Sequence, residues 1–199
     1  MLYKADLHEE QSFDDAVQGC HGVFHVAASM EPVLPSTENH DDSVQSNITN
    51  PLIKGALNIL KSCLRSKTVK RVVFTSSIST MTALNSDGER LPVVDESCRV
   101  VVGVVWDTKA SGWVYVLSKR LTEDAAFQFA KENDINLVSV ITITVAGGFI
   151  TPAVPLSIRF LLSPLTGCCP SDPKSTKAQP RAVTREIADT SGNQLLIEP

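Results

Sequence analysis

The sequence has 199 residues, of which 43% are hydrophobic and 20% charged, and its formal net charge is −4 at pH 7. A chain of this length can bury a sizeable core. The acidic balance argues against non-specific binding to nucleic acid or a membrane surface, because both need a basic footprint. No apolar run reaches the ~20 residues that span a bilayer, and the first residues lack the features of a signal peptide.

Neither the cysteines nor the histidines form a recognisable ligand or disulfide pattern. The 5 cysteines are odd in number and contain no Cys-x-x-Cys pair, which is typical of reduced thiols in a cytosolic protein. The 4 histidines gather towards the N-terminal end without metal-ligand spacing. We therefore expect a cytoplasmic location and no metal site.

Apolar runs alternate with helical patterns along the chain, which predicts a parallel sheet wrapped by helices. Residues 2–5 resemble the end of a strand. Ser12 followed by Asp15 resembles a capping box, which would open a short helix through Val17. Residues 23–27 then read as a short buried strand.

A polar loop over residues 29–41 leads to a predicted helix of about two dozen residues, which Pro51 is expected to kink or divide. Residues 71–74 form a β-branched strand that ends at 75–77. The predicted helix that precedes this strand has a buried stripe, which is expected to consist of Leu52, Ile53, Ala56, Leu57, Leu60 and Leu64.

The second half continues the alternation after a loop of some thirty residues, a length that is usually functional. The apolar pattern after this loop predicts a helix over 113–132, a strand over 137–141 and a short helix over 156–162. Beyond this point prolines and polar residues appear without periodicity. We therefore expect one folded α/β domain over 1–165, which the family resemblance described below implies is an incomplete NAD(P)-binding domain, and a poorly ordered tail over 166–199.

Tyr115 and Lys119 are the residues that point to chemistry. On a helix, residues four apart share a face with their β-carbons about 5–6 Å apart. An ammonium there favours loss of the phenolic proton, so the phenol can give that proton to a carbonyl oxygen near neutral pH. Ser77 ends a predicted parallel strand, where open α/β sheets place their ligands, and its hydroxyl could hold the same oxygen.

Several motifs in order give the chain a family resemblance. Asp6-Leu7, His25-Val26-Ala27-Ala28, Thr75-Ser76-Ser77 and Tyr115-x-x-x-Lys119 resemble the extended short-chain dehydrogenases/reductases. The sequence around Asp95-Glu96-Ser97-Cys98 and Gly112-Trp113-Val114-Tyr115 is similar to that of the plant dihydroflavonol and anthocyanidin reductase group. The resemblance implies an oxidoreductase that reduces flavonoid-like or phenolic ketones with NADP(H), NAD(H) being the alternative.

The resemblance also implies roles for individual residues. Tyr115 would donate the proton, and Lys119 would assist it and bind the nicotinamide ribose. Ser77 would orient the substrate oxygen, with Ser76 as the alternative. The remaining cofactor contacts would come from Asp6 and Leu7 at the adenine ring, from Val26, Ala27 and Ala28 beneath the ribose and pyrophosphate, and from Thr75, Ser76, Thr142 and Val145 near the nicotinamide.

The sequence departs from the family at its start, because it contains no Gly-x-x-Gly-x-x-Gly turn to hold the pyrophosphate. The implied fold is therefore α/β, a partial doubly wound Rossmann-type parallel sheet that lacks the first βαβ unit. An exposed sheet edge would then permit self-association. Two alternatives stay open: a truncated, non-catalytic Rossmann remnant, and epimerase or dehydratase chemistry on a nucleotide sugar.

Overall fold

The structure is a computed structural model that describes residues 2–27, 44, 48–82, 91–110, 112–149 and 154–166. The chain divides into two compact units, Met1–Ile143 and Thr144–Pro199. Within the described part of the chain, no helix is long and apolar enough to cross a membrane.

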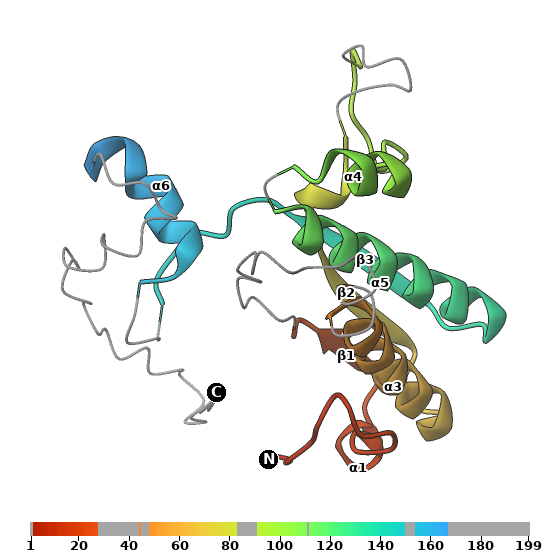
Figure 1. The fold of residues 1–199 in the computed structure, drawn as a ribbon. Coiled ribbons are helices and arrows are strands. Elements are labelled where there is room, and N and C mark those ends of the chain that lie inside the picture. The colour runs from red at the N-terminus through yellow and green to blue at the C-terminus, as the bar shows by residue number, and fades with distance from the viewer. Residues whose placement is uncertain are drawn as a thin grey trace. The chain divides into compact units, whose positions relative to one another are not determined.

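A three-stranded parallel sheet organises the first unit (Figure 1). Its strands are β1 (Gly22–His25), β2 (Arg71–Ser77) and β3 (Leu137–Thr142), hydrogen-bonded in the order β1-β2-β3. The β-branched and aromatic residues of β2 favour this extended conformation. The predicted α/β class with a partial Rossmann-type parallel sheet is confirmed.

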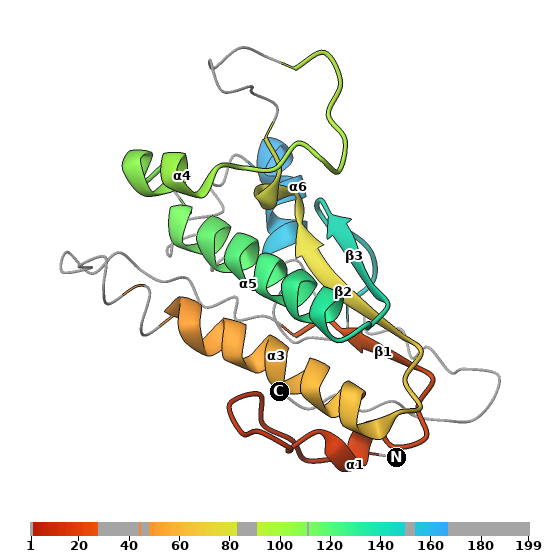
Figure 2. The ribbon, with the colours of Figure 1, turned by 90° about the vertical axis from the view of Figure 1, so that its right-hand side faces the viewer.

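Two long helices make the crossovers between these parallel strands. α3 (Asn50–Ser66) connects β1 to β2, and α5 (Trp113–Glu132) connects β2 to β3. The two helices lie side by side on the same face of the sheet (Figure 2). Crossovers of one hand that proceed in one direction across a sheet place their helices on one face.

Shorter helices complete the described elements. α1 (Asp14–Val17) packs against α3, where Arg65 Nη2 lies 2.6 Å from Asp14 Oδ1. The 3-10 turn η2 (Ile78–Thr80) follows β2 directly, and α4 (Val102–Thr108) packs against α5. In the second unit, α6 (Leu156–Thr166) is the helix that the structure describes.

The core of the first unit lies between the sheet and its two long helices. Leu117 of α5 is completely buried, and Val72 of β2 is 1% exposed. Alternate residues of β2 face this layer, as the period of two in a strand requires. The connected cluster of buried side chains consists of Val17, Ile59, Leu60, Cys63, Val72 and Ala126.

The opposite face of the sheet carries exposed apolar side chains. Phe24 of β1 is 75% exposed, and Val138 and Val140 of β3 are 40% and 44% exposed. Parallel sheets are normally covered on both faces. Among the described residues of the first unit, this face therefore has the apolar character of a central sheet while its side chains are exposed.

The structure corrects three predictions in the first half. Residues 2–5 belong to no strand among the described residues. Ser12 caps no helix, since its Oγ accepts a hydrogen bond from the Asp6 amide at 2.7 Å and α1 begins at Asp14. The predicted helix of about two dozen residues is shorter as α3, whose 17 residues start next to Pro51, where a proline costs no helical hydrogen bond, and residues 48 and 49 before it are π-helical.

The second half follows the predictions more closely. α5 has the predicted bounds, and β3 extends the predicted strand by one residue. The long loop contains α4, which the sequence did not indicate, and α6 continues beyond residue 162 to Thr166 with Pro164 inside it. Leu64, predicted to face the core, is 41% exposed. The expected loop over 29–41 and the tail beyond 166 lie outside the described residues.

Candidate functional site

The carboxyl ends of β2 and β3 meet at one edge of the sheet. Ser77 is the last residue of β2 and is paired with Thr142, the last residue of β3. Thr142 Oγ1 also donates a hydrogen bond to the Ser76 carbonyl oxygen at 3.2 Å. Two hydroxyl-bearing residues therefore stand together where open parallel sheets bind their ligands.

Lys119 brings a buried cation to this edge. It is 9% exposed, and its Nζ donates a hydrogen bond to the Thr75 carbonyl oxygen at 3.3 Å. Burial lowers the pKa of the Lys119 ammonium, while the negative charge of Glu123 acts in the opposite direction. The ammonium is thus held against the β2 backbone two residues before Ser77.

Ser77 and Ser76 occupy different environments despite being neighbours. Ser77 is half-buried, and its Oγ accepts hydrogen bonds from the amide of Ser79 at 3.2 Å and from the Ser79 hydroxyl at 3.1 Å. Ser76 is 2% exposed and donates its proton to Glu123 Oε2 at 2.9 Å. Ser77 therefore has the hydroxyl that remains accessible at the strand end.

Tyr115 is the third residue of α5, one helical turn before Lys119. Its side chain is half-buried. The helix packs against both β2 and η2, and η2 begins immediately after Ser77. Because residues four apart share a helix face, Tyr115 and Lys119 lie on the same side of α5, and Lys119 contacts β2 at the Thr75 carbonyl oxygen.

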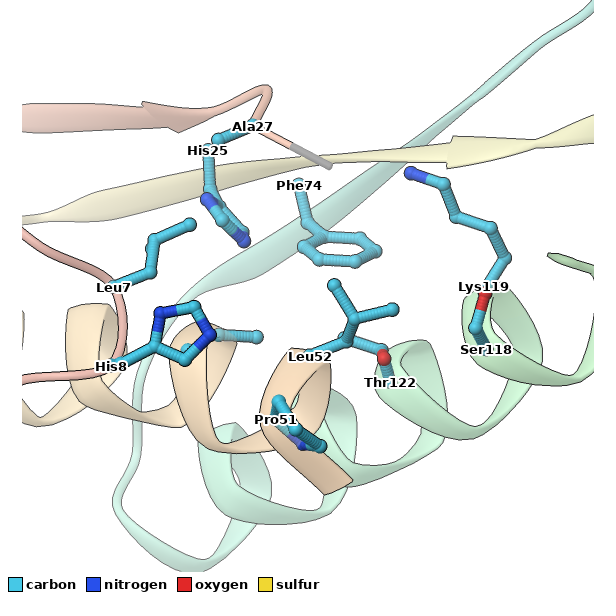
Figure 3. A pocket seen from close by; sticks show the side chains of 12 residues that line it. Leu7, His8, His25, Ala27, Pro51, Leu52, Phe74, Ser118, Lys119 and Thr122 are labelled. Carbon is cyan, nitrogen blue, oxygen red and sulfur yellow. The ribbon is translucent and has the colours of Figure 1, made fainter. Parts of the chain in front are cut away.

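A small cavity of about 50 Å³ lies beside Lys119, between α3, α5 and the ends of β1 and β2 (Figure 3). Three residues that were predicted to contact the cofactor line it, namely Leu7, Ala27 and Lys119. His25 and Phe74 form its floor, with their ring centroids 5.4 Å apart. The cavity thus gathers residues from five separate segments of the sequence.

His25 is a buried, uncharged member of this cavity. It is 7% exposed, and burial together with the positive charge of Lys119 lowers the pKa of its imidazole to about 4. At neutral pH the ring is therefore uncharged. The His25 ring therefore adds no positive charge beside the Lys119 ammonium.

Asp6 and Leu7 occupy a turn that packs onto α3. The Asp6 carboxylate accepts a hydrogen bond from the His8 amide at 2.8 Å, and contacts with His8 lower the pKa of this carboxyl. The Leu7 carbonyl oxygen accepts a hydrogen bond from Asn58 Nδ2 at 2.8 Å. At Gly55 a Cβ would lie 3.2 Å from the Leu7 Cβ, so the absence of a side chain there permits the close approach.

The other predicted site residues are placed less directly. Val26 is 63% exposed after β1, and Thr75 contributes its carbonyl oxygen to Lys119. Ala28 lies outside the described residues, and Val145 belongs to the second unit. Among the described residues no group of three or more His, Cys, Asp or Glu side chains could hold a metal ion.

Sequence reasoning missed three residues of this region. Glu123 is completely buried, Arg99 forms an ion pair with it, and His25 lies on the cavity floor. Glu123 follows Lys119 by four positions, so helical periodicity alone could have placed it on the same face. Nothing in the sequence around Arg99 indicates its partner.

The residues present fit one half of a dinucleotide cofactor. A fixed ammonium and two accessible hydroxyl groups at the strand ends suit a ribose and a nicotinamide. The small side chain of Ala27 lets the backbone after β1 approach a ligand closely. The 199-residue sequence contains no glycine-rich turn for the pyrophosphate.

A parallel sheet with crossover helices and a polar carboxyl edge defines a Rossmann-type α/β protein. The structure is similar to that of vestitone reductase from alfalfa, with a TM-score of 0.66 and 35% sequence identity over 81% of this chain and 46% of that one. The sequence profile of the NAD dependent epimerase/dehydratase family matches residues 1–161. The chain belongs to this family.

Plant reductases are prominent among its relatives. It is 43% identical to a dihydroflavonol 4-reductase of Medicago sativa over 83% of this chain and 72% of that protein. It is 42% identical to a putative anthocyanidin reductase of Ginkgo biloba, again over 83% of this chain but over 46% of that protein. The resemblance to this plant group is confirmed, although the chain spans about half the length of most of these relatives.

Proposed function

We propose that the chain is a reductase-type oxidoreductase that carries out the proton-transfer half of a ketone reduction. The observation that carries this proposal is the buried Lys119 ammonium, which is fixed at the end of β2 beside Ser77 and one helical turn from Tyr115. This arrangement provides a proton donor, a cation that assists it and a hydroxyl that holds the accepting oxygen.

Each of the three side chains has a separate task in the proposal. The Tyr115 phenol gives its proton to the carbonyl oxygen of the substrate. The accessible Ser77 hydroxyl donates a hydrogen bond to the same oxygen, while its bonds from Ser79 keep the Oγ in position. Lys119 favours the ionised phenol left behind and positions a ribose hydroxyl through its remaining donors.

The cofactor we propose is NADP(H), with Leu7, Ala27, Lys119 and Thr142 among the residues that would hold it. When bound, it supplies the hydride that reduces the carbonyl carbon. For the 199 residues assayed by themselves, which contain no glycine-rich turn, the affinity is expected to be low: two charge-assisted hydrogen bonds at about 1.5–3 kcal/mol each correspond to a loss of roughly 10²- to 10⁴-fold. We expect binding at millimolar rather than micromolar concentrations.

For the substrate we propose a flavonoid-like phenolic ketone, and no nucleic acid. The support comes from the relatives, which include dihydroflavonol 4-reductases and bifunctional dihydroflavonol 4-reductase/flavanone 4-reductases. The net charge of −4 favours a small-molecule substrate over a polyanion. We propose a cytoplasmic location, which the free thiols of Cys20, Cys63 and Cys98 support.

The assay that tests this function follows NADPH at millimolar concentration in the presence of a dihydroflavonol, a flavanone or a nucleotide sugar. A reductase oxidises NADPH with either ketone and forms the alcohol in equal amount. Interconversion of the nucleotide sugar without net NADPH loss would favour epimerase chemistry instead, because an epimerase returns its hydride. Binding of NADPH without turnover of any compound would favour a non-catalytic protein.

We further propose that the chain associates with a second copy of itself through β1. Within the described residues this strand is hydrogen-bonded along one edge alone, and its exposed Phe24 lies on the open apolar face. Free strand edges of this kind promote association. Sedimentation velocity should show dimers or larger species. Phe24→Lys should reduce their population, whereas the loop variant Val94→Lys should not. A monomer at all concentrations would contradict the proposal.

A further inference from the structure

A completely buried carboxylate lies one helical turn beyond Lys119. Glu123 is 0% exposed in the middle of α5. Its Oε1 accepts a hydrogen bond from Ser139 Oγ at 2.6 Å, and its Oε2 accepts one from Ser76 Oγ at 2.9 Å. Ser139 belongs to β3 and Ser76 to β2, so this single carboxylate joins the helix to both strands.

Arg99 supplies the opposite charge and extends the connection to the strand end. Its Nη2 lies 2.9 Å from Glu123 Oε2, and its Nη1 donates a hydrogen bond to Thr80 Oγ1 at 3.4 Å. Thr80 Oγ1 in turn donates to the Ser77 carbonyl oxygen at 2.9 Å, and the Thr80 carbonyl oxygen accepts from the Val100 amide at 2.9 Å. An unbroken path of polar contacts therefore runs from Glu123 to the backbone of Ser77.

The charges in this layer depend on one another. Burial by itself raises the pKa of the Glu123 carboxyl, but hydrogen bonds from Arg99, Ser139 and Ser76 bring it below its usual value of 4.5. The carboxylate is therefore ionised at neutral pH. Its charge raises the pKa of the Lys119 ammonium, against the effect of burial. Without it, Lys119 and Arg99 would be two partly buried cations with no anion between them.

We propose that Glu123 is a positioning residue, which holds the Ser77 end of β2 and the Lys119 ammonium in place through its bonds to Ser76, Ser139 and Arg99. That this positioning serves proton transfer rests on the proposed function. The hydrogen bonds and the ion pair of Glu123 do not depend on that function. Glu123 is not a catalytic residue, because its oxygens are fully buried and already bonded to protein groups.

The direct test is Glu123→Gln, which keeps the shape of the side chain and removes its charge. The titration of Lys119 is followed by NMR of side-chain-labelled lysine in the full chain. We expect the pKa of Lys119 to fall below its value in the unaltered chain, because the anion that favours the ammonium is gone. The control is Glu132→Gln, which removes an exposed carboxylate from the same helix and should leave Lys119 unchanged. An unchanged Lys119 pKa in Glu123→Gln would overturn the proposal.

A second variant keeps the proposal testable if Glu123→Gln fails to fold. Arg99→Gln leaves the carboxylate and cuts the path to Thr80. The amides of Val100 and Thr82, which donate to the Thr80 and Cys98 carbonyl oxygens at 2.9 Å, should then exchange with solvent about tenfold faster, which corresponds to ~1.4 kcal/mol of local stability. Exchange at the original rate would contradict the role of Arg99 and with it the path to Ser77.

Failure of this inference and failure of the proposed function give different results. Neither readout uses a cofactor or a ketone. If the chain reduces no ketone but the Lys119 pKa falls in Glu123→Gln and the amides exchange faster in Arg99→Gln, the positioning role of Glu123 stands and the reductase function is wrong. A chain that reduces ketones while Glu123→Gln leaves Lys119 unaltered retains the function and loses the positioning role.

Discussion

Acidification should destabilise the first unit through His25, and the magnitude follows from its burial. The imidazole has a pKa of about 4 in the folded chain against 6.5 for an ordinary histidine. Because the folded state disfavours protonation, stability is complete above pH 6.5 and is lost as the pH falls towards 4. At ~1.4 kcal/mol per pKa unit the full loss is about 3 kcal/mol, of which about 2 kcal/mol falls between pH 7 and pH 5.

Urea unfolding followed by tryptophan fluorescence measures this loss, since Trp106 and Trp113, the two tryptophans of the chain, both lie in the first unit. His25→Gln should remove most of the dependence on pH over this window, while the exposed His21→Gln should preserve it. Glu123 contributes little there, because its pKa lies below 4.5. An equal loss of stability in His25→Gln and in the unaltered chain would refute the reasoning.

Two further predictions concern stability at neutral pH. Leu117→Ala should lower the free energy of unfolding by about 2–5 kcal/mol, because the side chain is completely buried. Leu64→Ala, at a 41% exposed position of α3, should lower it far less. Equal losses of stability in urea unfolding would contradict the assigned core. Gly112→Ala should destabilise by about 1 kcal/mol, because Gly112 has φ +80° before α5. Gly103→Ala, with open space around it inside α4, should stabilise by up to ~1 kcal/mol, so thermal unfolding should shift in opposite directions for the two alanines.

Periodicity was enough to predict the elements that carry the site. β2, α5 and β3 have strong apolar patterns and clear boundaries, so their order along the chain already implied parallel strands with Ser77 at one end. Helical spacing then placed Tyr115 and Lys119 on one face of the predicted helix, and the resemblance to plant reductases implied their roles. The structure adds that Lys119 is buried and bonded to the Thr75 carbonyl oxygen.

Local patterns failed where a longer-range contact decided the structure. Ser12 has the residue type and spacing of a helix cap, but its hydroxyl accepts from the Asp6 amide instead. Arg99 lies in a loop without periodicity, and its partner Glu123 is 24 positions further along the chain. A buried ion pair of this kind depends on the packing of the loop against α5, which residue spacing does not encode.

The proton-donor role of Tyr115 is the central claim, and Tyr115→Phe tests it most directly because it removes one oxygen. The measurement compares ketone-dependent NADPH oxidation and NADPH binding in the unaltered chain, in Tyr115→Phe and in Tyr3→Phe, the change of the other tyrosine. We predict that Tyr115→Phe lowers turnover by about 10²-fold or more while NADPH binding stays within about twofold, and that Tyr3→Phe changes neither. Turnover that survives in Tyr115→Phe, or that is absent from the unaltered chain, would contradict the account.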